Sequence, residues 1–384
     1  MSTVIKNVNV VTVKGVISNG CVCIENGLIT YVGNEYQKGD IVIDGEGKYL
    51  LPGFIDIHCH GCLGQSFQNG SPKNYKVISD HHLKHGTTTL VATTVTAPMD
   101  NLVEALENYS IHKKEFPNTP VIGVHMEGPW LSPKQCGAQP TGTMRTPNPK
   151  DIEQLKEKYP FILRVGAAPE LDQNYSFSTK CAELGIVCSV AHTDATFKEI
   201  ESAIAGGYNL MTHLYSGMKG MYRENAYRIA GAIEAGLYFD ELYAEIIADG
   251  KHLPPELLKF IYKCKGADKL CLITDATSGC GYPNGTGLYA QELHTDIIIE
   301  DDVAKIPDRT SFAGSTATYD RLFKVMATAI GDNWVDLMKM TSYTPAKIMG
   351  FTDRGEISVG KKADLVIIDK NYNLNKIFYK GELI

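Results

Sequence analysis

The feature that most constrains the fold is a repeated alternation of apolar, β-rich runs with helix-like stretches between Pro52 and about Pro345. This alternation is typical of successive βα units that build a parallel sheet. Eight runs have the length and composition of strands, which is the number in a closed (β/α)8 barrel. They are Phe54 to His58, Thr88 to Thr94, Val121 to Met126, Phe161 to Val165, Val187 to Ala191, Leu210 to His213, Glu245 to Ala248 and Leu270 to Thr274.

Helix-like stretches fill several of the gaps between these runs. They are Asn74 to His85, Asp100 to Phe116, Lys150 to Lys158, Phe197 to Ala205 and Pro255 to Lys263.

The two ends of the chain have a different pattern, in which short strand-like runs are separated by turn residues such as Asn19-Gly20. Each end has too few of these runs to close a sheet alone. We therefore expect an α/β fold, with a TIM-type (β/α)8 barrel over residues 53–345 and one small β-sandwich built from residues 1–52 and 346–384. The runs are Val8 to Val13, Val22 to Glu25, Ile29 to Val32, Ile41 to Ile43, Gly355 to Ile357, Ala363 to Asp369 and Ile377 to Ile384.

Composition limits the function classes. The chain has 384 residues, of which 43% are hydrophobic and 21% charged, so it can bury a large core. A formal charge of -7 gives no basic field for nucleic acid, although one arginine can still bind a small anion. No run is long enough to span a membrane, and the first residues do not resemble a signal peptide. Ten scattered cysteines fit reduced thiols in a cytoplasmic enzyme.

One short motif carries most of the chemical information. His58 and His60 are two residues apart at the end of a predicted strand, so both imidazoles can face one metal ion. The same segment contains a lone C-x-x-C, Cys59 to Cys62, which leaves a redox or structural-zinc reading open. Further reactive side chains also lie at or just past predicted strand ends, where barrel enzymes gather their active sites. They are Glu127, His192, His213, His252 and Asp275.

Several motifs together resemble the amidohydrolase superfamily and, within it, the N-acetylglucosamine-6-phosphate deacetylases. The resemblance spans nearly the whole chain. Its landmarks are Pro52-Gly-Phe-Ile-Asp-Ile-His-Cys-His-Gly61, His125-Met-Glu-Gly-Pro-Trp130, Ala191-His192, Thr212-His-Leu-Tyr215, Ala248-Asp-Gly-Lys-His252, Thr274-Asp-Ala-Thr277 and Phe312-Ala-Gly-Ser315.

The resemblance implies a role for each residue of the metal site. Glu127, His192 and His213 would bind one divalent ion. His58 and His60 would allow a second ion, with Glu127 bridging and Asp275 beside it. Zinc is the first expectation for one or both positions, and iron, manganese and cobalt are alternatives. Asp275 would also be the general acid/base, and His252 would polarise the acetamide carbonyl.

The implied reaction is hydrolysis of the acetamide of N-acetyl-D-glucosamine 6-phosphate by a homodimeric enzyme, giving glucosamine 6-phosphate and acetate. The implied substrate contacts depart from the family pattern in three places. Gln139 stands where the family commonly has His, Ser216 and Gly217 replace an Asn-Ala pair, and the Arg-Glu segment lacks the usual Pro-Gly. The expected substrate contacts are Gln139, Ser216, Gly217, Arg223 with Arg228 in reserve, His252 and Ala313.

Three alternatives stay open. The departures also fit a related substrate such as N-acetylgalactosamine 6-phosphate. Cyclic-amide hydrolases and nucleobase deaminases share much of the metal site, although the run Phe161 to Gly166 lacks the lysine that bridges metals in many cyclic-amide hydrolases. A non-catalytic protein on the same barrel would typically have lost ligands, and this chain retains all of them.

Overall fold

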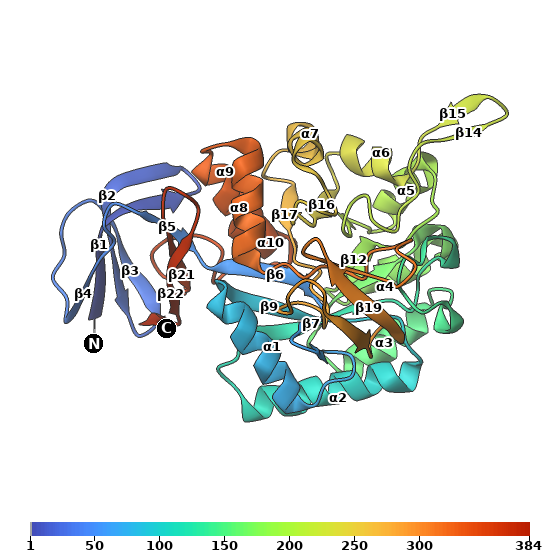
Figure 1. Ribbon diagram of the computed structural model, residues 1–384, viewed down its shortest axis with the longest axis horizontal. Coiled ribbons are helices and arrows are strands. Elements are labelled where there is room, and N and C mark those ends of the chain that lie inside the picture. The colour runs from blue at the N-terminus through green and yellow to red at the C-terminus, as the bar shows by residue number, and fades with distance from the viewer. Residues whose placement is uncertain (1) are drawn as a thin grey trace.

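The computed structural model describes residues 2–384 and has a mixed α/β fold with two large sheets (Figure 1). The larger part of the chain surrounds a parallel sheet of eight strands. All eight predicted barrel strands are confirmed, with small shifts at their ends. In order along the sheet they are β6 (Phe54–Cys59), β9 (Thr87–Thr94), β10 (Val121–Glu127), β11 (Ile162–Ala167), β12 (Val187–Val190), β13 (Leu210–Met211), β16 (Tyr243–Ile246) and β17 (Leu270–Leu272).

The sheet is nearly closed into a barrel, because the chain beyond β17 bonds to its other edge strand, β6. The Asp275 backbone N–H donates to the carbonyl oxygen of His58 at 2.9 Å, and the His60 N–H donates to that of Ala276 at 2.8 Å. These bonds lie at the carboxyl ends of both strands. Closure of the barrel therefore brings the His58 and Asp275 segments together.

Helices cover the outside of this sheet. The five predicted helices are confirmed, and further helices occur after β11, before β16 and beyond β17, where none was expected. The helices are α1 (Pro72–Lys84), α2 (Met99–Glu115), α3 (Pro149–Lys158), α4 (Ser176–Glu183), α5 (Phe197–Ala205), α6 (Ala232–Tyr238), α7 (Pro255–Lys265), α8 (Tyr319–Ile330), α9 (Trp334–Met338) and α10 (Thr344–Ile348), with a π-helical turn, η5 (Lys339–Tyr343), between the last two.

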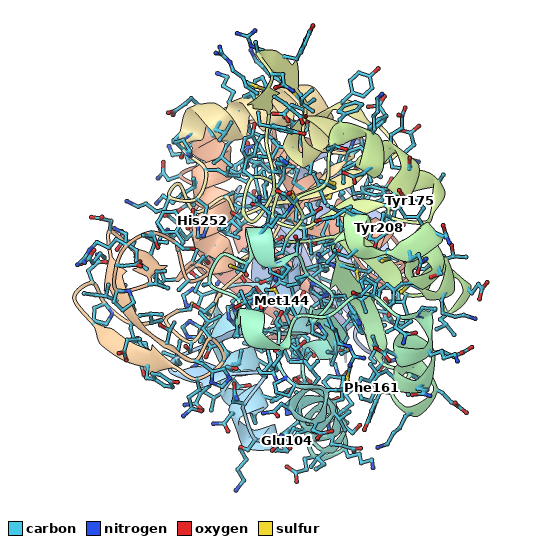
Figure 2. The ribbon with its side chains drawn as sticks, turned by 90° about the vertical axis from the view of Figure 1, so that its right-hand side faces the viewer. Glu104, Met144, Phe161, Tyr175, Tyr208 and His252 are labelled. Atoms are coloured by element: carbon cyan, nitrogen blue, oxygen red, sulfur yellow. The ribbon has the colours of Figure 1, made fainter. Side chains whose placement is uncertain are left out.

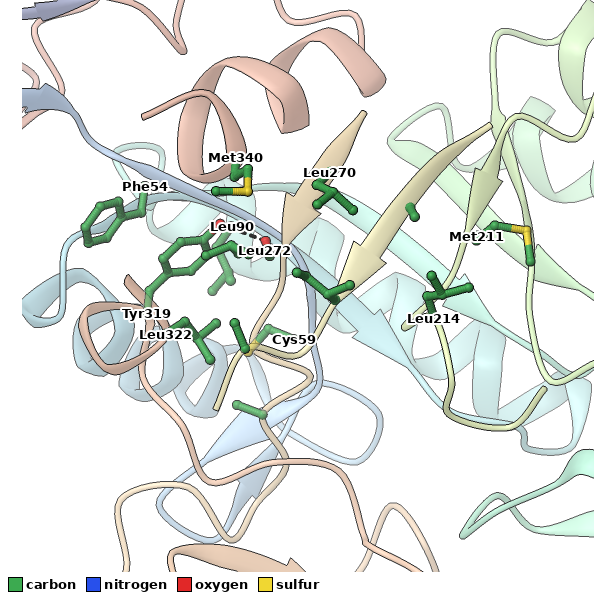
Figure 3. Packing of buried hydrophobic residues seen from close by; sticks show 14 of the residues in the cluster. Phe54, Cys59, Leu90, Met211, Leu214, Leu270, Leu272, Tyr319, Leu322 and Met340 are labelled. Carbon is green, nitrogen blue, oxygen red and sulfur yellow. Dashed lines mark hydrogen bonds between the residues drawn. The ribbon is translucent and has the colours of Figure 1, made fainter. Parts of the chain in front are cut away.

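The core between strands and helices fixes the closing edge of the barrel. The rings of Phe54 on β6 and Tyr319 at the start of α8 stack with their centroids 5.0 Å apart (Figure 3). The Tyr319 hydroxyl donates to the carbonyl oxygen of Leu272 on β17 at 2.7 Å. Both aromatic side chains are fully buried, so α8 ties the first and last barrel strands to each other.

Three additions to the barrel were not expected from the sequence. An antiparallel hairpin, β14 (Tyr222–Glu224) and β15 (Tyr227–Ile229), projects from the barrel beyond α5 and α6 (Figure 1). A three-stranded antiparallel sheet follows β17 and consists of β18 (Gly287–Ala290), β19 (Thr295–Glu300) and β20 (Val303–Lys305). A short pair, β7 (Gly61–Cys62) and β8 (Gln65–Ser66), follows β6.

The second large sheet combines strands from both chain ends. N-terminal β5 (Tyr49–Pro52) and C-terminal β21 (Leu365–Ile368) are antiparallel neighbours, with Leu50 opposite Ile367. The arrangement of this sheet as a two-layer sandwich stays a prediction. Its order is β23-β22-β21-β5-β1-β2-β3 with β4 beside β1, and the bounds are β1 (Ser2–Thr12), β2 (Gly15–Glu25), β3 (Leu28–Gly33), β4 (Ile41–Asp44), β5 (Tyr49–Pro52), β21 (Leu365–Ile368), β22 (Leu374–Tyr379) and β23 (Glu382–Leu383).

Within residues 2–384, no helix combines the length and the apolar character needed to cross a membrane.

We propose that residues 1–52 and 346–384 form one unit beside a barrel of residues 53–345. Leu365 on β21 is fully buried in a cluster with Ile5 and Leu50, so Leu365→Ala should cost about 2–5 kcal/mol through the cavity it leaves. Hydrogen exchange followed by mass spectrometry should show faster exchange in β1 and β5 as well as in β21. Val359→Ala, at a site that is 61% exposed, is the control. Faster exchange confined to residues 346–384 would contradict the proposal.

Candidate active site

A cavity of about 180 Å³ lies at the carboxyl ends of the barrel strands. Most of the residues expected to form the site line it, and they come from separate strands that the barrel brings together. The lining includes His60, Glu127, Gln139, His192, His213, Ser216, Gly217, His252 and Asp275.

The carboxylate of Glu127, at the end of β10, lies at the centre of the site and is 1% exposed. Its Oε1 is 2.8 Å from the Nε2 of His213 and 3.2 Å from the Nε2 of His192. Its Oε2 faces the first motif, at 3.3 Å from the Nε2 of His60 and 3.6 Å from the Nε2 of His58. The two oxygens of one carboxylate thus face two different pairs of imidazoles.

Asp275 lies beside the second pair of imidazoles, those of His58 and His60. Its Oδ1 is 3.1 Å from the Nε2 of His60 and 3.4 Å from the Nε2 of His58. The two imidazole Nε2 atoms are themselves 3.2 Å apart. Three side chains therefore direct ligand atoms to one small volume.

The Nδ1 atoms of three of these histidines each face a hydrogen-bond acceptor within the protein. The Nδ1 of His192 is 2.8 Å from the carbonyl oxygen of Gln135, and that of His213 is 3.2 Å from the carbonyl oxygen of Ser216. The Nδ1 of His58 is 3.4 Å from the Oε2 of Glu245. Since a carbonyl oxygen and an ionised carboxylate only accept, each Nδ1 carries a hydrogen, and Nε2 is the nitrogen that would bind an ion once any proton on it is displaced.

The site attracts positive charge. Burial would lower the pKa of His58, but the charge of Glu127 and hydrogen bonds to Glu127 and Glu245 raise it to about 10. Burial would likewise lower the pKa of His60, but Asp275 and Glu127 raise it to about 9. Burial would raise the pKa of Asp275, but the hydrogen bond from His60 and the charges of His58 and His60 lower it to about 2. Either protons or metal ions must supply the positive charge that these carboxylates require.

This donor set fits a divalent metal. Imidazole and carboxylate ligands of this kind bind zinc and its neighbours in the first transition row. Three groups of buried side chains have ligand atoms close enough to hold an ion, and two of them lie in this site, namely His58 with Glu127 and His213, and His58 with His60 and Asp275. The third group is Asp56 with Cys59 and His82. His192 also faces the Oε1 side of Glu127, at 3.2 Å, where it could supply a further ligand.

The backbone turns sharply where three site residues follow their strands. His192, His213 and Asp275 have φ values of 41°, 27° and 47°, in the left-handed region that such residues rarely adopt. Each lies two or three residues beyond the end of β12, β13 or β17. Strain of this kind, of about 1–3 kcal/mol per residue, is typical of functional sites held in place by their surroundings.

His252 lines the cavity from the loop after β16 and is labelled in Figure 2. Its Nδ1 is 2.8 Å from Asp249 Oδ2, and its backbone N–H donates to Asp249 Oδ1 at 2.8 Å. Burial would raise the pKa of Asp249, but the hydrogen bond and charge of His252 lower it. Asp249 thus fixes the orientation of the His252 ring. The Nε2 of His252 is the ring nitrogen left to contact a substrate. The sequence analysis missed Asp249, which the i, i+3 spacing to His252 could have revealed.

Not every expected substrate contact reaches the cavity. The side chain of Ala313 packs in a separate apolar cluster, and its N–H donates to the carbonyl oxygen of Ala304 at 2.9 Å. Ser216 and Gly217 do line the cavity, but the Ser216 N–H already donates to the carbonyl oxygen of His213 at 2.9 Å. Gly217 has φ of +56°, and a Cβ there would come within 2.6 Å of the His192 Nδ1, so this position requires glycine.

Arg223 and Arg228 lie on the projecting hairpin and not in the cavity lining. Figures 1 and 2 show the hairpin at the outer end of the molecule. Among residues 2–384, no lysine or arginine lines the cavity.

The segment after β17 adds side chains that the sequence analysis missed. Leu293, Ser311 and Phe312 line the cavity from the region of the β18–β20 sheet. The Phe312 ring lies 4.7 Å from the ring of His252 between centroids. The motif Phe312-Ala-Gly-Ser315 pointed to this segment, but its strands were not expected.

Comparison with known proteins identifies the chain. The model of the amidohydrolase family matches residues 49–384. The N-acetylglucosamine-6-phosphate deacetylase of Bacillus subtilis is 32% identical over 394 aligned positions, covering 100% of this chain and 97% of that protein. This protein belongs to the amidohydrolase family. Its full-length similarity to the Bacillus protein groups it with the N-acetylglucosamine-6-phosphate deacetylases.

Two further relatives bear on the substrate of this amidohydrolase. A solved structure of a mutant N-acetyl-D-glucosamine-6-phosphate deacetylase from Mycobacterium smegmatis, in complex with N-acetyl-D-glucosamine-6-phosphate, has a TM-score of 0.90 and 27% identity over 100% of this chain and 98% of that one. The N-acetylgalactosamine-6-phosphate deacetylase of Escherichia coli O157:H7 is 27% identical, with 89% of each chain covered.

The cysteine motif lies behind the metal site of this amidohydrolase. Cys59 and Cys62 are both free and fully buried, and the Cys59 Sγ is 3.3 Å from the Nε2 of His82 on α1. The contact packs β6 against α1. It gives the C-x-x-C a position in the core, on the other side of the strand from His58 and His60.

Metal affinity should depend on pH in a defined direction. The raised pKa values of His58 and His60, about 10 and about 9, mean that both rings are protonated at pH 7 in the metal-free protein, so an ion must displace these protons. Apparent zinc affinity should therefore rise between pH 6 and 8, by up to about tenfold per pH unit for each proton released. Titration with a competing chromophoric chelator measures it.

The same titration on Glu127→Gln tests the central ligand, because this change keeps the shape of the side chain and removes its charge. Zinc binding should be lost or greatly weakened at every pH. Glu300→Gln, at a partly exposed position of β19 where the carboxylate pairs with Arg309, is the matched control. Affinity that is independent of pH, or that survives in Glu127→Gln, would contradict the assignment.

Proposed function

We propose that this amidohydrolase removes the acetyl group from N-acetyl-D-glucosamine 6-phosphate, giving glucosamine 6-phosphate and acetate. The observation that carries this function is the Glu127 carboxylate, which faces four imidazoles at the barrel mouth with Asp275 and His252 around the same cavity. The similarity to deacetylases over the whole chain supports the choice of substrate.

The residues of the site divide the chemistry between them. A divalent ion held by Glu127, His192 and His213 would act as a Lewis acid and would make a water molecule a better nucleophile. Asp275 is ionised, since its pKa is lowered to about 2, and it can take a proton from the attacking water and pass it to the departing amine. The Nε2 of His252 can contact the carbonyl oxygen of the acetamide, where negative charge develops.

We propose two ion positions that share Glu127, with zinc as the first candidate and iron, manganese or cobalt as alternatives. The support is geometric, because each Glu127 oxygen has its own set of nitrogen neighbours, and Asp275 supplies a further oxygen ligand beside His58 and His60.

Ten free cysteines support a reducing, cytoplasmic location.

We also propose a homodimer in which the hairpin of one copy supplies the phosphate contact of the other. Arg223 and Arg228 are directly opposite each other on β14 and β15, so their side chains lie on one face of the hairpin. Paired guanidinium groups suit a phosphate dianion. The projecting hairpin and the lack of a cation in the lining formed by residues 2–384 both support a contact from a second copy.

A second candidate substrate is N-acetylgalactosamine 6-phosphate. It is favoured by the similarity to the Escherichia coli protein and by the departures at Gln139, Ser216 and Gly217. The deciding experiment measures acetate release from N-acetylated glucosamine, galactosamine and mannosamine, each with and without the 6-phosphate. The largest kcat/KM should belong to the phosphorylated glucosamine compound.

Asp275→Asn should separate proton transfer from binding. The amide cannot accept the proton from water, so kcat should fall by a factor of about 10² to 10⁴, while KM changes little and at least one ion stays bound. Steady-state kinetics and metal analysis on the same sample measure both. Near wild-type turnover by this variant would require a different general base.

Arg223→Ala should lower kcat/KM for the phosphorylated sugar and leave slow turnover of the unphosphorylated sugar almost unchanged, because the phosphate contact mainly positions the substrate. Tyr227→Ala, an exposed change on the same hairpin, is the control.

Co-expression of Arg223→Ala with Asp275→Asn tests which copy supplies the arginine. Mixed dimers should regain activity, since the Asp275→Asn copy contributes an intact hairpin to the intact cavity of the Arg223→Ala copy. A homogeneous monomer, or no recovery, would contradict the shared site.

A further inference from the structure

Gln139 has an unusual position for a residue expected to contact the sugar. It lies in the segment between two short 3-10 helices, η1 (Pro133–Gln135) and η2 (Thr141–Thr143), and is 8% exposed. Its Oε1 accepts the Thr96 backbone N–H at 2.8 Å, and its Nε2 donates to the Oε2 of Glu127 at 2.7 Å. Both ends of the amide are therefore bonded within the protein.

The orientation of this amide is fixed by its partners. A backbone N–H can only donate, and an ionised carboxylate can only accept, so the reversed amide would lose both bonds. Burial would raise the pKa of Glu127, but the charge of His58 and the hydrogen bonds from His192 and His213 keep it well below its usual value. The bond from Gln139 to Glu127 is thus a short hydrogen bond to a charged acceptor, which is among the stronger kinds.

The bond acts on one particular oxygen of the carboxylate. Rotation about the last torsion of a glutamate side chain has only broad preferences, so the carboxylate plane has to be set by its neighbours. Oε2 is the oxygen that faces His58 and His60, and it is also the one that accepts from Gln139. Oε1, which faces His192 and His213, receives no bond from Gln139.

We propose that Gln139 is a positioning residue for the Glu127 carboxylate, and that it favours ion binding at the Oε1 side of the site over the Oε2 side. It sets the carboxylate plane so that Oε1 points between His192 and His213, and it occupies a lone pair of Oε2. The inference rests on the proposed metal-dependent function. It also changes the expected role of Gln139, because a contact with the sugar would require one of the two observed bonds to break.

Gln139→Met is the main test, since methionine has a similar length and cannot hydrogen bond strongly. Zinc is added to the metal-free protein in competition with a chromophoric chelator, and kinetics are measured on the zinc-loaded enzyme. The affinity of the tighter ion should fall by about 10- to 100-fold, the range found when partners of metal ligands are removed. The kcat should fall with it, while KM should stay within about threefold of wild type, because the sugar does not contact this side chain.

Gln68→Met is a matched control. Gln68 is 5% exposed, and its amide ties the neighbouring loop in the same way, through bonds of 3.3 Å with the Val95 N–H and the Asn101 carbonyl oxygen. It does not line the cavity, so this variant should keep the zinc affinity of wild type even if its unfolding temperature falls. Gln139→His restores a nitrogen donor and should recover part of the lost affinity.

Two results would overturn the proposal while leaving the deacetylase function intact. One is a KM raised tenfold or more in Gln139→Met with unchanged zinc affinity, which would make Gln139 a sugar contact. The other is an equal loss of zinc affinity in Gln139→Met and Gln68→Met, which would reflect a general loosening of the loops. Failure of the wild-type protein to bind zinc, iron, manganese or cobalt would overturn this inference and the proposed function together.

Discussion

The candidate metal site depends on an ion pair buried inside the barrel beneath it. Arg164 on β11 and Glu245 on β16 are both fully buried and pair through two contacts, one of which joins Nη2 to Oε2 at 2.9 Å. Arg164 also donates to the hydroxyls of Ser189 and Thr212, at 3.2 Å and 3.0 Å. Loss of either partner would leave an unpaired charge in the interior, at a cost of about 3–5 kcal/mol. A pair of this kind is tolerated only if every member of the network is present.

The ion pair is linked to the site through Glu245, which contacts two of the histidines. The Oε2 of Glu245 lies 3.4 Å from the His58 Nδ1 and accepts the His213 backbone N–H at 3.3 Å. It thereby orients one histidine ring and the backbone of another, on opposite sides of Glu127. Burial would raise the pKa of Glu245, but the charge of Arg164 keeps it low, so Glu245 stays an acceptor. The chain of contacts from Arg164 to Glu245 to the imidazoles explains how ligands from different strands keep one orientation.

The sequence allowed the strands to be predicted, and the residues proposed as metal ligands meet in one site, because both follow local rules. Residues two apart, such as His58 and His60, face the same side of any strand. A closed barrel brings the ends of its strands together whatever lies between them in the sequence. The supporting residues could not be found in the same way, since Arg164 and Glu245 are 81 positions apart and meet only in the closed barrel. A charged residue within an apolar strand was the available signal for Arg164. The β14–β15 hairpin escaped prediction because Asn225 and Ala226 form its turn without a glycine.

Most of the residues proposed to recognise the substrate lie on different elements from the proposed metal ligands. The proposed metal ligands all come from strand ends or from residues just beyond them, and their geometry is set by the interior of the barrel. Ser311 and Phe312, in contrast, come from the loop after β20, Leu293 from the β18–β19 connection, and the arginine pair from a projecting hairpin. Loops of this kind can change in sequence without disturbing the core. Epimeric sugars differ in the direction of one hydroxyl, and a site distinguishes them by giving that hydroxyl a hydrogen-bond partner or denying it one. That choice can be made in the loops alone, which accounts for relatives that share the barrel but act on different amino sugar phosphates.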